Sequence, residues 1–261
     1  MGTFKDSLKK WFYTQGTAAG TTDSRIPLLD ASGNPIGSDT LQNVGKLIEQ
    51  ARPTTTIGNV MVVTNVESYT RFWPADRALE ESIANIAVGA GIIENGRTLI
   101  IAKDAANKKW ATDNASGSGK GGTTAISDIR DAIADFDGRA KTTTILATLG
   151  DNAPAAKYCN EYHPSNVASS DTNMGAGRWW LPSFGEWAMI WAHVRDVNFV
   201  LAAIGGTQIP VGSGLAWCST EYSAAYAWYL DFGGGAFGLL YRGYKTAESS
   251  VRPVSAAMKK D

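Results

Sequence analysis

Apolar residues recur at helical spacing near the start of the chain. In residues 4–12 (FKDSLKKWF) they stand at i, i+4, i+7 and i+8 with lysines between them, which predicts a short amphipathic helix. Its apolar stripe is too small for a stable isolated helix, so we expect it to dock on this chain or on a partner. Turn signals follow at 30–35, a second short helix is predicted over 41–48, and 51–58 is typical of a linker.

From Val60 onward the pattern becomes that of a mixed domain. Residues 60–66 (VMVVTNV) predict a strand, and a helix is predicted after Pro74 with Leu79, Ile83 and Ile86 facing inward. The dipeptide Asn95-Gly96 stands between two apolar runs, which predicts a β-hairpin.

Three further segments show helical periodicity. Residues 125–136 carry isoleucines and Phe136 at helical spacing, and 153–162 place small and aromatic residues along one side. In the third, 181–197 (LPSFGEWAMIWAHVRDV), Ser183 and Glu186 have the spacing of a capping box and a tryptophan-rich stripe follows. This segment carries the clearest helix signal of the chain.

Short strands are predicted over 216–254, and the stretch 221–245 (EYSAAYAWYLDFGGGAFGLLYRGYK) carries few charges. Alternation explains Trp217, Trp228, Leu230 and Phe232 as core. It explains the tyrosines less well, because some must fall on the opposite face. Tyr, Ser and Gly are also the residues of binding loops, so core packing and a binding face remain alternatives at this point. Glycines at 233–235 and 238 interrupt any flat, aggregating strand.

Composition narrows the class of protein. The 261 residues are 44% hydrophobic and 19% charged with a net charge of −1, which is typical of a folded protein and gives no electrostatic reason to expect nucleic acid or an anionic membrane as a partner. No apolar run approaches the about 18 residues that a membrane helix needs, and the N-terminus lacks the apolar region of a signal peptide. We expect Cys159 and Cys218 to be free and buried.

Candidate chemistry is sparse. His193 has no second His or Cys at metal-ligand spacing, and we do not expect His163 and His193 to bind a metal; 117–124 (GSGKGGTT) fails the spacing of a phosphate-binding loop. Glu186 is explained by helix capping, and no carboxylate pair suggests acid–base catalysis. We therefore expect no catalytic residues, no metal, no cofactor and no enzymatic activity.

Several motifs occur in the order of one family. The segments GRWWLPSFGEW (177–187), WCSTEY (217–222), Ala227-Trp228 and VRPV (251–254) resemble the C-type-lectin-like domains of bacterial and phage proteins, which are related in fold to formylglycine-generating enzymes. The resemblance covers about residues 85–257 and departs at Cys218, where the pattern has Ser. It implies an α+β, C-type-lectin-like fold of short antiparallel strands with two or more helices. The calcium-ligand motifs of sugar-binding animal lectins are absent.

A narrower resemblance is to the variable proteins of diversity-generating retroelements, in which mutated codons alter a displayed surface. Such codons cannot yield Lys, Glu, Gln, Met or Trp, and between 222 and 244 only Trp228 belongs to that set. The resemblance implies a fixed scaffold of Trp217, Glu221, Tyr222, Trp228, Leu230, Phe232 and Val251-Arg252-Pro253. It implies a ligand-binding set of Ser223, Ala224, Ala225, Tyr226, Tyr229, Leu239, Leu240, Tyr241, Arg242 and Tyr244.

The N-terminal part resembles the start of phage tail and tail-fibre proteins. We therefore expect an N-terminal helical or turn-rich attachment segment (1–56), a connecting strand and helix (57–84) and the ligand-binding domain (85–261). The expected function is that of a phage tail-tip or tail-fibre receptor-binding protein on the virion, with a bacterial surface receptor and other tail proteins as partners and a homotrimer by analogy. The alternatives are a binding protein displayed on a bacterial surface and a modifying enzyme of the formylglycine-generating type, for which the paired cysteines are missing.

Overall fold

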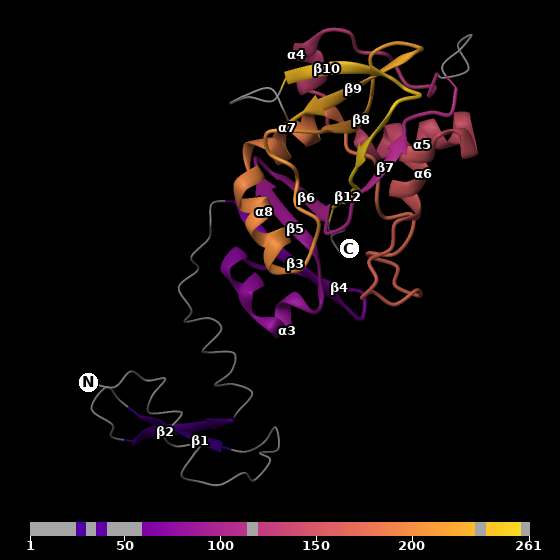
Figure 1. Cartoon of the computed structure of the whole chain (residues 1–261). Helices are drawn as coiled ribbons and strands as arrows, with labels where there is room; N and C mark the ends of the chain where they lie inside the picture. Colours follow the sequence, from indigo (N-terminus) through magenta and orange to yellow (C-terminus); the bar gives the residue numbers. More distant parts are fainter. Residues whose placement is uncertain (1–24, 30–34, 41–58, 114–119, 233–238, 257–261) are drawn as a thin grey trace. The chain divides into compact units, whose positions relative to one another are not determined.

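The computed structural model describes residues 25–29, 35–40, 59–113, 120–232 and 239–256, and it divides into two compact units, Met1–Thr54 and Thr55–Asp261 (Figure 1). In the first unit, β1 (Arg25–Leu29) and β2 (Pro35–Thr40) form an antiparallel hairpin. The sequence signals gave only the turn between these strands. The helices predicted over 4–12 and 41–48 lie outside the described residues.

The second unit contains a five-stranded antiparallel sheet in the order β12-β6-β5-β3-β4. The hairpin at Asn95-Gly96 is confirmed, because both residues have positive φ (50° and 73°) and Glu94 pairs with Arg97. The segment 57–84, expected as a connection, supplies β3 between β5 and β4. The strands are Val254–Ser255, Arg97–Ala102, Ala87–Glu94, Val60–Val66 and Tyr69–Pro74.

The helix predicted after Pro74 is shorter than expected. The chain forms a 3-10 turn η1 (Ala75–Leu79) and a four-residue helix α3 (Glu81–Ala84), and Leu79 is 69% exposed whereas Ile83 is buried. Ile86, the last apolar residue of the predicted helical pattern, lies beyond α3 and directly before β5, which begins at Ala87. The inward orientation predicted for Leu79 is therefore wrong.

A second five-stranded sheet has the order β10-β9-β8-β11-β7. Its pairs are antiparallel except β11 with β8, which is parallel. The prediction of short strands over 216–254 is confirmed, and β7 was not predicted. The strands are Leu239–Tyr244, Tyr226–Asp231, Leu215–Glu221, Glu248–Val251 and Ala106–Lys109.

Helices α7 (Phe184–Ala192) and α8 (Val194–Ala203) join the two sheets through the main core. Helix α8 contacts β3 and β5, and α7 contacts β8 and β9, so one apolar cluster includes residues from both sheets (Figure 1). The capping box is confirmed: Ser183 and Glu186 exchange both hydrogen bonds. Among the described residues no helix is long and apolar enough to cross a membrane.

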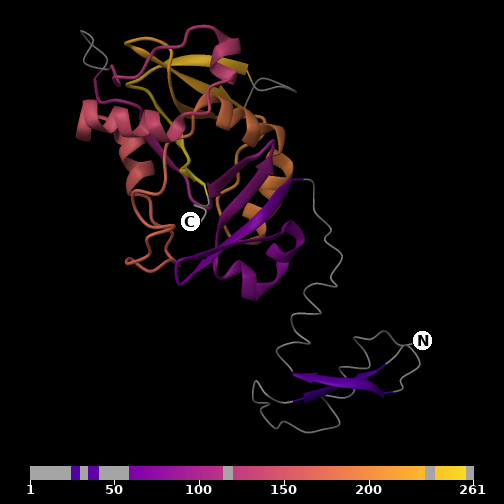
Figure 2. The same ribbon diagram turned by 180° about the vertical axis from the view of Figure 1, so that it is seen from behind.

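Helices α5 (Gly138–Leu149) and α6 (Pro154–Glu161) contact β8 and β7, respectively (Figure 2). A second core cluster includes Trp110, Ile145 and Trp217. Helix α6 is confirmed. The helix predicted over 125–136 forms only as α4 (Ile129–Ile133), with Ile133 44% exposed. Helix α5 was not predicted, because its run of threonines has no apolar stripe of helical period.

Candidate ligand-binding face

The turn between β8 and β9 and the paired end of β10 form an aromatic surface. Register places Tyr244 opposite Tyr226, and Arg242 opposite Trp228, so alternation puts these four side chains on one side of the sheet. Tyr222, in the turn, reaches the same side. We call Tyr222, Tyr226, Arg242 and Tyr244 the tyrosine face.

The side chains of the tyrosine face contact one another in pairs. The rings of Tyr226 and Tyr244 have centroids 4.4 Å apart, and a hydrogen bond with Tyr244 raises the pKa of the Tyr226 hydroxyl. The Arg242 guanidinium lies 4.6 Å from the centre of the Tyr222 ring and donates to its hydroxyl at 3.1 Å. Tyr244 is 55% exposed and Arg242 is exposed, so this pre-arranged set is open to a partner.

Below the face, Tyr222 joins the surface to the core. Its ring meets that of Trp228 edge-on with centroids 5.2 Å apart, and Trp228 packs in turn on Phe184 of α7 at 5.3 Å. Trp228 also donates from Nε1 to the carbonyl of Ile126 at 2.7 Å. The exposed rings therefore rest on side chains whose positions the core fixes.

A buried ion pair holds the turn in place. Glu221 and Lys245, the last residue of β8 and the residue after β10, are 3% and 0% exposed as side chains and form a salt bridge. The Lys245 ammonium also donates to the carbonyl of Ala224 at 3.1 Å. Burial lowers the pKa of Lys245, although the hydrogen bond and charge of Glu221 act to raise it.

Glu221 also fastens the neighbouring loop. Its carboxylate accepts from the Gly121 amide at 2.7 Å and from the Thr123 amide at 3.1 Å, and from the Thr123 hydroxyl. We did not expect a phosphate-binding loop here. The backbone amides of Gly121 and Thr123 donate to a carboxylate of the chain itself, which agrees with that expectation. Of GSGKGGTT, residues 117–119 lie outside the described residues.

The predicted ligand-binding residues fall in three places. Ser223, Ala224 and Ala225 form the half-buried turn, and Tyr226, Arg242 and Tyr244 lie on the tyrosine face. Tyr229 lies on the other side of the sheet, where its ring meets Trp217 edge-on at 5.6 Å. Leu239, Leu240 and Tyr241 have backbone in β10, but their side chains lie outside the described residues.

The predicted scaffold is buried at Trp217, Glu221, Trp228, Leu230, Phe232 and 251–253. Tyr222, assigned to the scaffold by resemblance, is half-buried and belongs to the face as well. The sequence pattern assigns no role to Lys245. It is a single lysine at the end of a stretch with few charges, and its partner Glu221 is 24 residues away in the chain.

Other titratable groups are used structurally. Both cysteines are free and buried, as expected, and burial raises the pKa of both thiols. Burial raises the pKa of Glu186 to about 7, against hydrogen bonds from Ser183 and Trp180 that lower it.

His193, expected inside the helix, follows α7 and pairs with Glu94 at 3.0 Å. In the part of the chain described, no group of three or more His, Cys, Asp or Glu side chains is placed to hold a metal ion.

Comparison with known proteins adds little to this geometry. No protein-family description matches the sequence, and no curated protein matches it. A crystal structure of a fimbrial protein from Bacteroides ovatus ATCC 8483 is similar, with 15% identity and a TM-score of 0.48. The match covers 60% of this chain and 35% of that one, so the chain spans about a third of that protein. The second unit is α+β with mainly antiparallel sheets, and the C-type-lectin-like fold stays a prediction.

Proposed function

We propose that the unit Thr55–Asp261 is a non-catalytic binding module with a C-type-lectin-like fold, and that the tyrosine face contacts its ligand. The observation that carries the proposal is the partly exposed, mutually contacting set Tyr222, Tyr226, Arg242 and Tyr244 on a turn held by a buried ion pair. Tyrosine and arginine are, with tryptophan, the residues enriched at interface hot spots.

The physical basis is pre-organisation. A tyrosine ring supplies a large contact area and loses little side-chain entropy, because it has only two rotatable bonds. Here the ring contacts and the turn restrict that freedom before any partner arrives, which reduces the entropic cost of binding. Arg242 adds a charged donor beside the rings, suited to a carboxylate, carbonyl or hydroxyl of a partner.

The proposed setting is a phage tail tip or tail fibre, with a bacterial surface receptor as the ligand. The N-terminal unit would attach the module to other tail proteins, and several copies on one particle, as in a trimer, would add avidity. The alternative setting is the surface of a bacterium that displays the same module. Mass spectrometry of purified particles against cell envelopes separates the two settings.

The tyrosine face is tested by replacing Tyr226 and Tyr244 together with serine in the full-length chain. We expect the variant to lose its ability to compete with particles for adsorption to host cells, while its free energy of unfolding falls by less than about 1 kcal/mol, as for surface substitutions. Unchanged competition by a folded variant would refute the proposal.

Tyr69 offers a matched control. It is 60% exposed on β4, and Arg71 lies 4.9 Å from its ring centre, so it repeats the tyrosine–arginine contact on the other sheet. Tyr69→Ser should leave competition intact. If it abolished competition equally, a general loss of surface aromatic area would explain the result and the assignment to this face would fail.

A further inference from the structure

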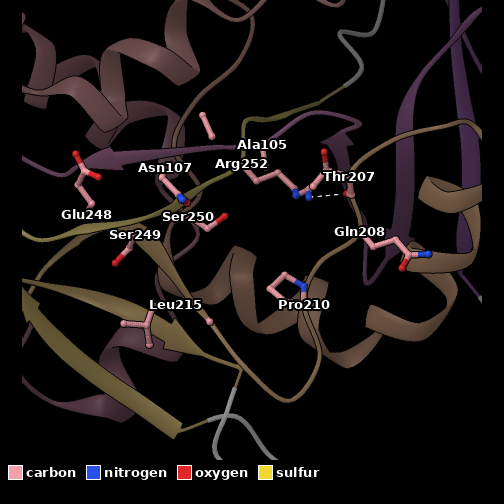
Figure 3. A pocket seen from close by; sticks show the side chains of 12 residues that line it. Ala105, Asn107, Thr207, Gln208, Pro210, Leu215, Glu248, Ser249, Ser250 and Arg252 are labelled. Atoms are coloured by element: carbon pink, nitrogen blue, oxygen red, sulfur yellow. Dashed lines mark hydrogen bonds between the residues drawn. The ribbon is translucent and has the colours of Figure 1, made fainter.

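A cavity of ≈ 640 Å³ opens at the end of β8 opposite to the tyrosine face. Its walls are β7, β11 and the loop that leads from α8 into β8 (Figure 3). The apolar part of the lining comes from Ala106, Pro210 and Leu215. No part of the proposed receptor contact uses this cavity.

Polar side chains of β11 line the cavity in a row. Glu248, Ser250 and Arg252 alternate along the strand and its continuation, so they share one face, and Asn107 of β7 pairs with Ser250. Figure 3 shows Asn107, Ser250 and Arg252 along one side and Pro210 across from them. At a rise of about 3.3 Å per residue, the backbone of Glu248 is about 13 Å from that of Arg252. The row therefore runs from an acidic to a basic end.

Arg252 is the unusual member of this row. It is 2% exposed, and its guanidinium donates to the carbonyls of Ala102 and Thr207, both at 2.7 Å. A guanidinium has five N–H donors, so these two bonds leave three without an acceptor among the described residues. In the same part of the chain no carboxylate lies within ion-pair distance of it.

The charge of Arg252 is therefore incompletely compensated. Burial lowers the pKa of Arg252 to about 10, against the negative charge of Asp104, which acts to raise it. The Asp104 carboxylate accepts a hydrogen bond from the Tyr162 hydroxyl at 2.7 Å, whereas the Arg252 guanidinium donates to the carbonyls of Ala102 and Thr207. A buried cation that has spare donors and lines a cavity favours an anionic ligand there.

We propose that this cavity binds a small organic molecule through a single carboxylate, which Arg252 receives, while Ser250 and Asn107 add hydrogen bonds and the apolar wall covers the body of the ligand. The acidic end at Glu248 disfavours molecules that carry several negative charges. The site is independent of the tyrosine face, so either assignment can fail without the other.

The probe pair is benzoate and benzamide, which have similar shape and differ in charge. Amide chemical shifts of the full-length chain, followed by NMR, should move at Ser250 and Thr207 with benzoate. We expect benzamide to bind at least about tenfold more weakly, because it cannot form a charge-assisted pair. Absence of shifts with benzoate, or equal affinity for benzamide, would overturn the proposal.

Variants locate the binding. Asn107 is exposed, so Asn107→Asp should fold normally, and it should weaken benzoate binding about tenfold by placing a negative charge opposite Ser250. Arg252→Lys should also weaken it, because an ammonium cannot reproduce the planar fork of donors. If Arg252→Lys does not fold, Asn107→Asp decides alone.

Glu248→Gln is the matched control for the acidic end. Because Glu248 is exposed and lies more than a Debye length from Arg252 at physiological salt, it should change benzoate affinity by less than about twofold. A change as large as that of Asn107→Asp would place the carboxylate elsewhere in the cavity. Unchanged binding in Asn107→Asp would overturn the site itself.

Discussion

Replacing Lys245 with methionine tests whether the buried ion pair holds the turn beneath the tyrosine face. The ammonium is fully buried, contacts Glu221, donates to the Ala224 carbonyl, and lies 4.2 Å from the ring centre of Trp110. Methionine has a similar length and keeps the apolar contacts of the lysine stem. The substitution therefore removes mainly the charge and its hydrogen bonds.

The expected cost follows from what remains around Glu221. Removing one partner of a buried pair typically costs about 3–5 kcal/mol, since it leaves an uncompensated charge. Here the carboxylate keeps the donors of Gly121 and Thr123, so we expect the lower end, about 3 kcal/mol. For a domain of this size that lowers the melting temperature by about 6–12 °C.

The assay is urea unfolding monitored by tryptophan fluorescence, to which Trp110 contributes beside the substituted position. The double variant Glu221→Gln with Lys245→Met removes both charges, and we expect it to recover to within about 1 kcal/mol of the wild type. A loss below about 1 kcal/mol for Lys245→Met would refute the reasoning. So would a double variant no more stable than the single one.

Two further predictions concern stability. Because the pKa of Glu186 is raised from 4.5 to about 7, its protonated form stabilises the fold fully below pH 4.5, and this contribution, about 3 kcal/mol, is lost as the pH rises through 7. Glu186→Gln keeps the capping geometry and should flatten thermal stability between pH 5 and 7.5; an unchanged slope contradicts this. Gly243→Ala would place Cβ 2.5 Å from the Tyr229 ring and 2.9 Å from Trp217, and it should cost about 1–3 kcal/mol in urea unfolding. Wild-type stability would show that the two rings can move apart.

Local patterns predicted those elements whose signal lies within one element. The capped helix at Ser183, the hairpin at Asn95-Gly96 and the C-terminal strands all have such signals, and all formed. The segment after Pro74 and helix α5 did not follow the prediction, because tertiary contacts decided them: strand pairing of β5 begins at Ala87, directly after the first segment, and packing on β8 stabilises the second.

The candidate site was predictable as composition but not as geometry. The sequence identifies the tyrosines of 221–245 as candidates for a binding face. Which tyrosines lie on which face of the sheet depends on strand register, and a one-residue shift in register would move each side chain to the opposite face. The roles of Lys245 and Arg252 required long-range contacts. Their partners stand 24 residues away at Glu221 and 150 residues away at Ala102.

Strands β11 and β12 have a consequence for synthesis. Residues 248–251 lie in the interior of one sheet, between β8 and β7, and 254–255 pair with β6 in the other. Neither sheet is complete during translation until these residues have emerged, although α7 and most strands are already present. A chain interrupted before Glu248 would expose two unpaired interior edges and become a substrate for proteolysis or aggregation. Only a chain translated through residue 255, beyond the tyrosine-rich stretch, can complete both sheets.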